Sequence, residues 1–316
     1  MSLFRIIVGV FLLQLSLVHI GRDVTTWYGY NGLLPHEAIK EFVWNNTPRL
    51  DMLLIFPRTN AGVMTFWYLY IATLICMTIG LFTRYATIFV WLALVTMHNL
   101  MPFNLNGGDH ILRFYCMCMI FSESGASLSC DRLIKRFRHP RLGADAHAPL
   151  VPALGQRLLQ IQTCLTYWST VCYKLSGPQW LDGTAVYYAL RQDDLYRFSC
   201  PFITDNLFLC KIADYFTIFI ETAMFTLVWI KECRYWVLLG ILTLHLGIDY
   251  FFNLPVFQWA MIAGLINFVD AADLAGVMNA CNTRIARVFG PAQALLFNPA
   301  DRPQAQLACV IEGLNI

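Results

Sequence analysis

The sequence predicts an all-α integral membrane protein with about eight transmembrane helices and structured outer loops. Its 316 residues are 58% apolar and only 13% charged, whereas an ordinary soluble domain is about 45–50% apolar and about 25% charged. A soluble chain of this composition would lack the polar surface that keeps it dispersed. The net charge of +2, without basic clusters interleaved with aromatic residues, argues against nucleic acid as a partner.

Eight apolar segments approach the length of about 20 residues that a membrane-spanning helix needs. They are residues 3–20, 63–82, 85–102, 110–124, 154–175, 207–230, 235–252 and 256–273. The first segment lacks a small-residue cleavage site, so we expect it to be a retained helix rather than a signal peptide. We therefore expect one membrane domain over residues 1–273 and a cytoplasmic tail over 274–316.

The distribution of Lys and Arg predicts the orientation, because positively charged loops stay in the cytoplasm. The loop 125–153 carries five such residues close together: Arg132, Lys135, Arg136, Arg138 and Arg141. Counting spans from this loop puts the N-terminus and the C-terminus in the cytoplasm. The long loops 21–62 and 176–206 then lie outside. The sequence thus predicts a multi-pass protein of a bacterial-type inner membrane.

The long outer loops are predicted to be structured. Residues 180–198 have the pattern of an amphipathic helix lying on the outer surface. Cys200 and Cys210 flank an outer loop, and they are candidates for a disulfide if that side is oxidising. The cysteines show no zinc-binding spacing, so we expect no metal site.

Lys174 is the most informative residue, because it follows an apolar stretch, residues 158–173, that carries no charge. A cation in a bilayer costs roughly 2.5–3.5 kcal/mol, so it is usually kept for function. A lysine near a helix end can instead extend to the headgroups. If Lys174 is functional, a desolvated lysine can act as a general base.

The other ionisable groups near the spans are few, and the predicted topology puts several of them at the outer side. His245 and Asp249 are four residues apart, so they share a helix face and could form a hydrogen bond. Glu221 lies midway along the sixth span, where a structural pair and a catalytic role are equally open.

The sequence Asn106-Gly107-Gly108-Asp109-His110 reads as a turn followed by a helix start. The glycines would let the chain turn sharply, and Asp109 would serve as a capping residue or as part of a site. Arg113, one turn later, should need an acidic partner inside a span.

Several short motifs follow one another along the chain: Gly80-Leu81-Phe82-x-Arg84, Asn106-Gly107-Gly108-Asp109-His110-x-x-Arg113, Ser129-x-Asp131, Tyr167-x5-Tyr173-Lys174-Leu175-x4-Trp180-x-Asp182-Gly183-Thr184-Ala185, Glu221 and His245. In this order they resemble the HTTM family, the membrane domain shared with vitamin K-dependent γ-glutamyl carboxylase and with SdpB-type proteins. The resemblance covers roughly residues 3–272.

The resemblance implies a lysine base at the outer membrane surface that deprotonates reduced vitamin K. In the carboxylase, oxygen then generates a stronger base, which removes a glutamate proton before CO2 adds. Lys174 matches the base, and His245 matches a histidine near the quinone. Asp109 and His110 fall where the carboxylase has a charge-stabilising histidine. The expected cofactors are therefore a vitamin K-like quinol with O2 and CO2.

Four more residues are candidates for holding such a cofactor: Arg113, Tyr173, Trp180 and Glu221. Tyr173 stands where the carboxylase has a second lysine. The carboxylase also continues into a large lumenal domain that grips its substrate, so glutamate carboxylation by this chain would need a partner subunit. The sequence thus predicts either a membrane enzyme or a non-catalytic SdpB-like subunit. Its expected partners are membrane lipid and a secreted peptide or partner protein.

Overall fold

The computed structural model describes the chain except for residues 46, 139–151, 199–200, 278–279 and 281–316. The described part is all-helical and has no strand; one isolated antiparallel bridge joins Tyr196 to Phe252. The predicted tail 274–316 lies almost wholly outside the described residues, and Cys200 lies outside them too.

A helix covers most of each of the eight predicted apolar segments. These helices are α1 (Ser2–Gln14, continued by a π-helical segment, Leu15–Ile20), α4 (Asn60–Ile79), α5 (Thr83–Leu100), α6 (Gly107–Ile120), α8 (Leu154–Leu175), α12 (Leu207–Thr226), α13 (Lys231–Phe251) and α14 (Pro255–Leu265). In the described residues, three helices are long and apolar enough to cross a membrane: Ser2–Ile20, Asn60–Ile79 and Leu207–Trp229.

A fourth span exists if Val256–Phe268 and Ala271–Val277, which are bent by 106° at a short break, count as one. The other helices are shorter or more polar. Helix α6 has only 14 residues, and α8 contains Arg157 and Lys174. Three or four candidate spans are therefore present, and the number of eight stays a prediction.

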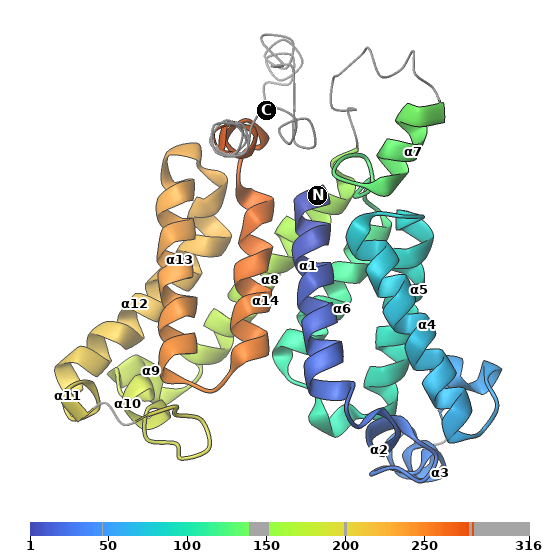
Figure 1. Ribbon diagram of the computed structural model, residues 1–316. Helices are drawn as coiled ribbons and strands as arrows, with labels where there is room; N and C mark the ends of the chain where they lie inside the picture. Colours follow the sequence, from blue (N-terminus) through green and yellow to red (C-terminus); the bar gives the residue numbers. More distant parts are fainter. Residues whose placement is uncertain (46, 139–151, 199–200, 278–279, 281–316) are drawn as a thin grey trace.

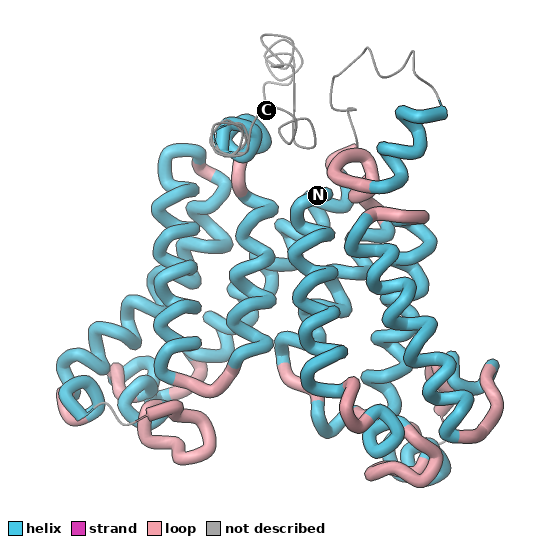
Figure 2. The backbone as a smooth tube through the Cα atoms, in the orientation of Figure 1, coloured by secondary structure: helices cyan, strands magenta, loops and turns pink. Residues whose placement is uncertain are grey.

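The long helices form two groups that stand side by side (Figures 1 and 2). Helices α1, α4, α5 and α6 enclose one apolar core, and α8, α12, α13 and α14 enclose most of the other. Helix α14 joins the two groups, because Ala260 belongs to the first core and Met261 to the second. Successive residues of one helix thus serve both halves.

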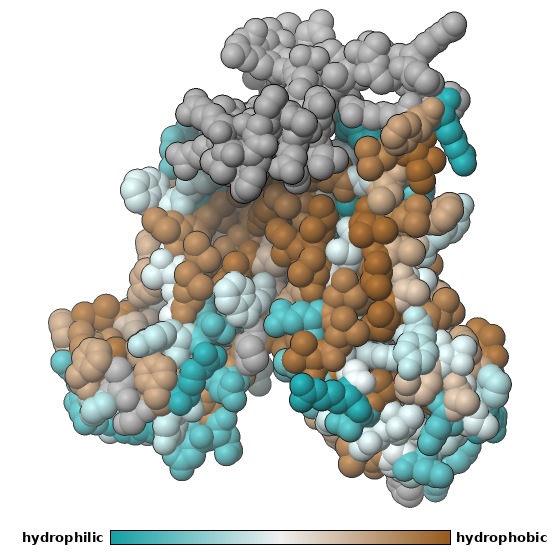
Figure 3. Space-filling model, in the orientation of Figure 1, coloured by the Kyte–Doolittle hydropathy of each residue, from teal (hydrophilic) through white to brown (hydrophobic). Residues whose placement is uncertain are grey.

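The two ends of the bundle differ (Figure 1). The N-terminus, helix α7 (Cys130–Arg138) and the start of α13 lie at one end. Five short helices lie at the other: α2 (Val24–Tyr28), α3 (His36–Ala38), α9 (Pro178–Asp182), α10 (Ala185–Ala189) and α11 (Pro201–Thr204). The predicted inner and outer loops therefore separate to opposite ends. On the face in Figure 3, apolar residues fill the middle, and polar residues gather on two lobes at the end with the short helices.

The expected single helix over residues 180–198 is wrong, because the segment contains two short helices. Helix α9 ends at Gly183, whose φ of +76° is the left-handed conformation that glycine adopts without strain. The Asp182 carboxylate then accepts a hydrogen bond of 3.0 Å from the Thr184 N–H. This turn starts α10 in a new direction.

Asp131 closes the turn between α4 and α5 from a distant part of the chain. Its carboxylate accepts hydrogen bonds from the N–H groups of Phe82 (2.8 Å) and Thr83 (2.9 Å), and from the Thr83 hydroxyl (2.7 Å). These groups begin α5, so Asp131 caps this helix in trans. Burial alone would raise the pKa of Asp131, but these donors hold that pKa below its ordinary value.

The sequence suggested that the paired glycines before Asp109 make a sharp turn, but they do not. Both lie inside the first turn of α6, and neither has a positive φ. Gly108 is instead a point of close approach to α14. A Cβ atom there would lie 2.7 Å from the backbone nitrogen of Phe257. The motif needs glycine because two helix ends meet, and backbone atoms have little freedom to move away.

We expect Asp131→Asn to destabilise the protein by about 1 kcal/mol at neutral pH, since the cap loses its charged acceptor. Because folding lowers the pKa of Asp131, its contribution is present above the ordinary aspartate value of about 3.9 and is lost as the pH falls through the folded value. Unfolding in detergent at several pH values measures this. Asp194→Asn, at an exposed position, should change little. An unchanged difference at low pH would contradict the assignment.

We expect Gly108→Ala to lower the free energy of unfolding by about 1–3 kcal/mol, because the added Cβ overpacks the contact with α14. Gly247→Ala is the matched control, since a Cβ at Gly247 in α13 meets nothing within 4 Å. That substitution should be neutral or stabilising by up to about 1 kcal/mol through helix propensity. Thermal unfolding of the purified proteins in one detergent compares the two; equal effects would disprove the close-packing argument.

Candidate functional site

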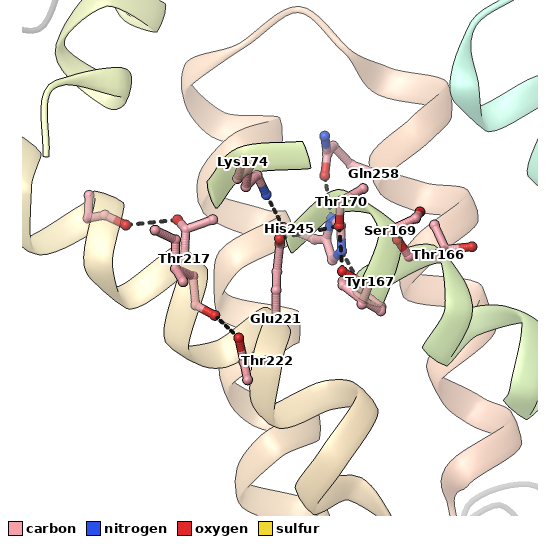
Figure 4. A network of polar contacts seen from close by, with 12 residues as sticks. Thr166, Tyr167, Ser169, Thr170, Lys174, Thr217, Glu221, Thr222, His245 and Gln258 are labelled. Carbon is pink, nitrogen blue, oxygen red and sulfur yellow. Dashed lines mark hydrogen bonds and ion pairs between the residues drawn. The ribbon is translucent and has the colours of Figure 1, made fainter. Parts of the chain in front are cut away.

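One face of α8 carries the polar side chains of the candidate site. Tyr167, Thr170 and Lys174 are spaced by three and four residues, so they lie above one another along the helix. This face meets Glu221 of α12, His245 of α13 and Gln258 of α14 (Figure 4). Four helices thus contribute to a single polar cluster inside the second apolar core. We call these six residues the α8 network.

Lys174 and Glu221 form the charged part of the α8 network. The ammonium group contacts a carboxylate oxygen of Glu221 directly, with the lysine side chain 19% exposed and the glutamate side chain 8% exposed. The Thr170 hydroxyl lies 3.4 Å from the other carboxylate oxygen. The sequence left open whether Glu221 forms a pair, and the structure shows that its partner is Lys174. A buried carboxylate needs such a partner, because the surrounding apolar groups do not solvate it.

The neutral part of the α8 network is a buried chain from Tyr167 through His245 to Gln258. The Tyr167 hydroxyl lies 2.7 Å from Nε2 of His245, and Nδ1 of His245 contacts the side-chain oxygen of Gln258. Since that oxygen only accepts, Nδ1 carries a proton. A neutral imidazole then accepts at Nε2, and the tyrosine donates. All three side chains are almost fully buried.

The expected hydrogen bond between His245 and Asp249 is not formed. Both ring nitrogens of His245 are already engaged by Tyr167 and Gln258. Asp249 turns instead toward the segment between α10 and α11, where its Oδ1 lies 3.9 Å from a guanidinium nitrogen of Arg197. Spacing along one helix made the pair feasible, but residues from α8 and α14 approach the imidazole more closely.

Asp109, His110 and Arg113 lie in a different place. The Asp109 carboxylate accepts a hydrogen bond of 2.9 Å from the Asn106 N–H and completes a capping box with it. His110 and Arg113 line a cavity of about 650 Å³ between α5, α6, α8 and α14. No hydrogen bond or ion pair of the described residues joins these three to the α8 network, so the predicted residues form two groups.

Phe257 stands between the two groups. Its ring lines the cavity with His110 and Arg113, and the ring centroid lies 6.3 Å from that of His245. Thr166 also lines the cavity, while Tyr167, the next residue, belongs to the α8 network. The cavity and the network therefore share α8 and α14 as walls.

Of the remaining predicted residues, Trp180 contacts Lys174. Its ammonium group lies 5.0 Å from the centre of the Trp180 ring, a cation–π contact. Tyr173 is 84% exposed and is not part of the α8 network. Cys210 is buried, and its thiol donates to the Ile203 carbonyl at 3.5 Å. The disulfide with Cys200 stays a prediction, since Cys200 is outside the described residues.

The sequence interpretation missed Thr170 and Gln258, and it did not assign Tyr167 to a site. It considered only ionisable groups inside the spans, whereas the partners of His245 are neutral. Gln258 carried a usable signal, because a polar amide within the apolar segment 256–273 must find a hydrogen-bonding partner. Within the described ranges, no group of three or more His, Cys, Asp or Glu side chains could hold a metal ion.

The chain matches a family model over residues 37–272, and that model describes the HTTM domain. The match covers well over half of the 316 residues. It includes the whole α8 network and the cavity beside Phe257. No curated protein and no solved structure matches the chain.

We expect Lys174→Met and Glu221→Gln each to destabilise the protein by about 3 kcal/mol or more, since either change strands one buried member of the pair. The double variant should lose clearly less than the sum of the two, because neither charge remains. Thermal unfolding in detergent of the wild type, the two single variants and the double variant gives this double-mutant cycle. Lys231→Met, at an exposed lysine, should change stability by no more than about 0.5 kcal/mol. Additive single effects would rule out a coupled pair.

Proposed function

Because the chain belongs to the HTTM domain family, we propose that it is a membrane enzyme that takes a proton from a lipophilic hydroxyl compound of the quinol type. Lys174 is the base, and Glu221 is its proton partner. The apolar helices are consistent with a membrane protein. We place the short helices α2, α3 and α9–α11 outside a bacterial-type inner membrane, with the N-terminus in the cytoplasm.

One observation carries the proposal: a lysine and a glutamate are paired in an apolar core, and only the lysine side reaches the surface. Lys174 is 19% exposed beside a more enclosed Glu221. A hydroxyl group can therefore approach the nitrogen without first displacing the carboxylate. The Trp180 ring, 5.0 Å from the ammonium nitrogen, offers a flat apolar substrate a surface for stacking.

The proton transfer balances within the pair. Lys174 first passes one proton to Glu221, which leaves a neutral amine beside a neutral carboxylic acid. The amine then takes the proton of the substrate hydroxyl, so an ammonium ion forms next to the new oxyanion. The low-dielectric surroundings strengthen this attraction, which favours ionisation of the substrate. When the oxyanion has left, Glu221 gives its extra proton to water at the exposed side of Lys174, and the resting ion pair returns.

Tyr167, His245 and Gln258 act as positioning residues in this proposal. Their buried hydrogen bonds tie α8 to α13 and α14, which fixes the face of α8 that presents Lys174. In the carboxylase, O2 and then CO2 react after the proton has left. By this resemblance, we propose that O2 reacts with the deprotonated substrate here as well. A secreted peptide or a partner subunit is the corresponding proposal for the final acceptor.

A non-catalytic subunit is the second candidate, favoured by the fact that the ion pair already satisfies both charges. In this role Lys174 and Glu221 would only hold α8 against α12. The exposed aromatic residues of the short helices, such as Tyr188 and Phe202, would then contact a peptide or partner protein. The two candidates differ in whether Lys174 is needed for turnover or only for stability.

The enzyme proposal predicts base-catalysed oxidation of phylloquinol by O2, because a quinolate reacts with O2 far more readily than a quinol. Wild-type protein in lipid nanodiscs should accelerate oxygen consumption over empty nanodiscs. Lys174→Ala should lower that rate about 100-fold or to background, the range of a lost general base. Glu221→Gln should also lower it. Lys231→Ala and Tyr173→Phe, both at exposed positions, should keep the wild-type rate.

Folding is checked separately, since Lys174→Ala also removes a stabilising pair. Variants are compared at a temperature at which each retains its cooperative unfolding transition. Full activity of folded Lys174→Ala would overturn the enzyme proposal. A wild-type rate equal to that of empty nanodiscs would do so as well, and would support the non-catalytic subunit.

A further inference from the structure

The cavity beside Phe257 is separate from the α8 network and has a character of its own. It is a partly open cavity of about 650 Å³ between α5, α6, α8 and α14, within the range of about 300–1,000 Å³ that is usual for small-molecule sites. Most of its lining is apolar, with Trp91, Phe114 and Met261 among the larger side chains. An apolar chain or ring would fill such a space better than water.

Arg113 gives this apolar cavity a positive charge. Its guanidinium group donates to Nδ1 of His110 at 3.2 Å. No carboxylate lines the cavity, and none of the ion pairs between described residues includes Arg113. The acidic partner that the sequence led us to expect is therefore not supplied, because the nearby Asp109 caps its own helix.

Arg113 lies about midway along α6 and beside the apolar lining of the cavity. It stands six residues after Gly107, the first residue of α6, which is about 9 Å along the axis. Helix α6 begins at the end of the bundle that carries α2 and α3 (Figure 1). Because α6 has 14 residues, a charged head at Arg113 would lie about midway along this helix, beside the apolar side chains of the lining. A guanidinium group binds carboxylate and phosphate with two parallel hydrogen bonds.

We propose that this cavity binds an acyl lipid with an anionic head, a carboxylate or a phosphate, whose charge pairs with Arg113. The acyl chain packs against Trp91, Phe114 and Met261. Free inorganic phosphate would leave this apolar lining unfilled, so the ligand needs a chain. The site does not depend on the proposed function, because neither Lys174 nor Glu221 lines it.

The experiment uses full-length protein in a neutral detergent after removal of its lipids. Native mass spectrometry measures the binding of oleate and of phosphatidylglycerol, which distinguishes a fatty acid from a phospholipid. Methyl oleate is the matched ligand without a charge. We expect one molecule of oleate or phosphatidylglycerol to bind, and methyl oleate to bind at least about tenfold more weakly.

Two variants test the charge of Arg113 and the volume of the cavity separately. Arg113→Gln should weaken binding of the charged lipid about tenfold or more, whereas Arg84→Gln, at an exposed arginine of α5, should not. Met117→Trp narrows the cavity and should weaken binding with Arg113 intact. Lys174→Ala should bind the lipid as the wild type does, even if it has lost oxidation of phylloquinol. This result would keep the outcome of the lipid test independent of the enzyme proposal.

Three results would overturn the inference. Binding of neither lipid by the wild type would show that the cavity takes no anionic lipid. Equal binding by Arg113→Gln would show that the arginine does not hold the head. Equal binding of methyl oleate would show that the charge is irrelevant. Binding of only one of the two charged lipids would support the site and identify its ligand class.

Discussion

Polar groups inside this bundle must find partners on neighbouring helices, because the apolar side chains around them offer no hydrogen bonds. The α8 network is the largest consequence. Glu221 could not remain charged in its core without Lys174, and His245 could not be buried without acceptor and donor groups on two other helices. Each contact joins a different pair of helices, so satisfying them also fixes the arrangement of α8, α12, α13 and α14.

The same constraint acts at the other half of the bundle. Arg5, fully buried in α1, donates to the carbonyl groups of Ser124 (2.6 Å) and Leu128 (2.5 Å). The segment that accepts these bonds leads directly to Asp131, which caps α5. The family motifs around Gly80 and Asp131 therefore have a structural role. They hold the turn between α4 and α5 to the N-terminal helix.

Where a polar group inside the bundle lacks a partner of opposite charge, the structure suggests that a ligand supplies it. Arg113 is the clear case, since it faces an apolar cavity and its described contact is to a histidine. Lys174 is different, because its charge is neutralised within the chain but remains partly accessible. One cation is suited to hold an anion, and the other is suited to exchange a proton. The two sites share α8 and α14 as walls, yet they need not act on the same molecule.

The sequence alone determined the helical class and the position of the long helices, and it singled out Lys174, Glu221 and His245, which the structure brings into one network. Composition and apolar runs are local properties, and an ionisable residue in such a run is conspicuous without coordinates. A capping role of Asp109 was readable in part: the sequence suggested the N-cap position, whereas Asn106 is the N-cap and Asp109 is the third residue of the helix.

Only the tertiary structure decided which polar groups meet. In the structure, His245 forms hydrogen bonds with Tyr167 and Gln258 rather than with Asp249, and Arg113 lines a separate cavity. These outcomes depend on how α8, α13 and α14 pack, and packing brings together residues far apart in the chain. Spacing along one helix shows which contacts are feasible, but the neighbouring helices determine which of them form.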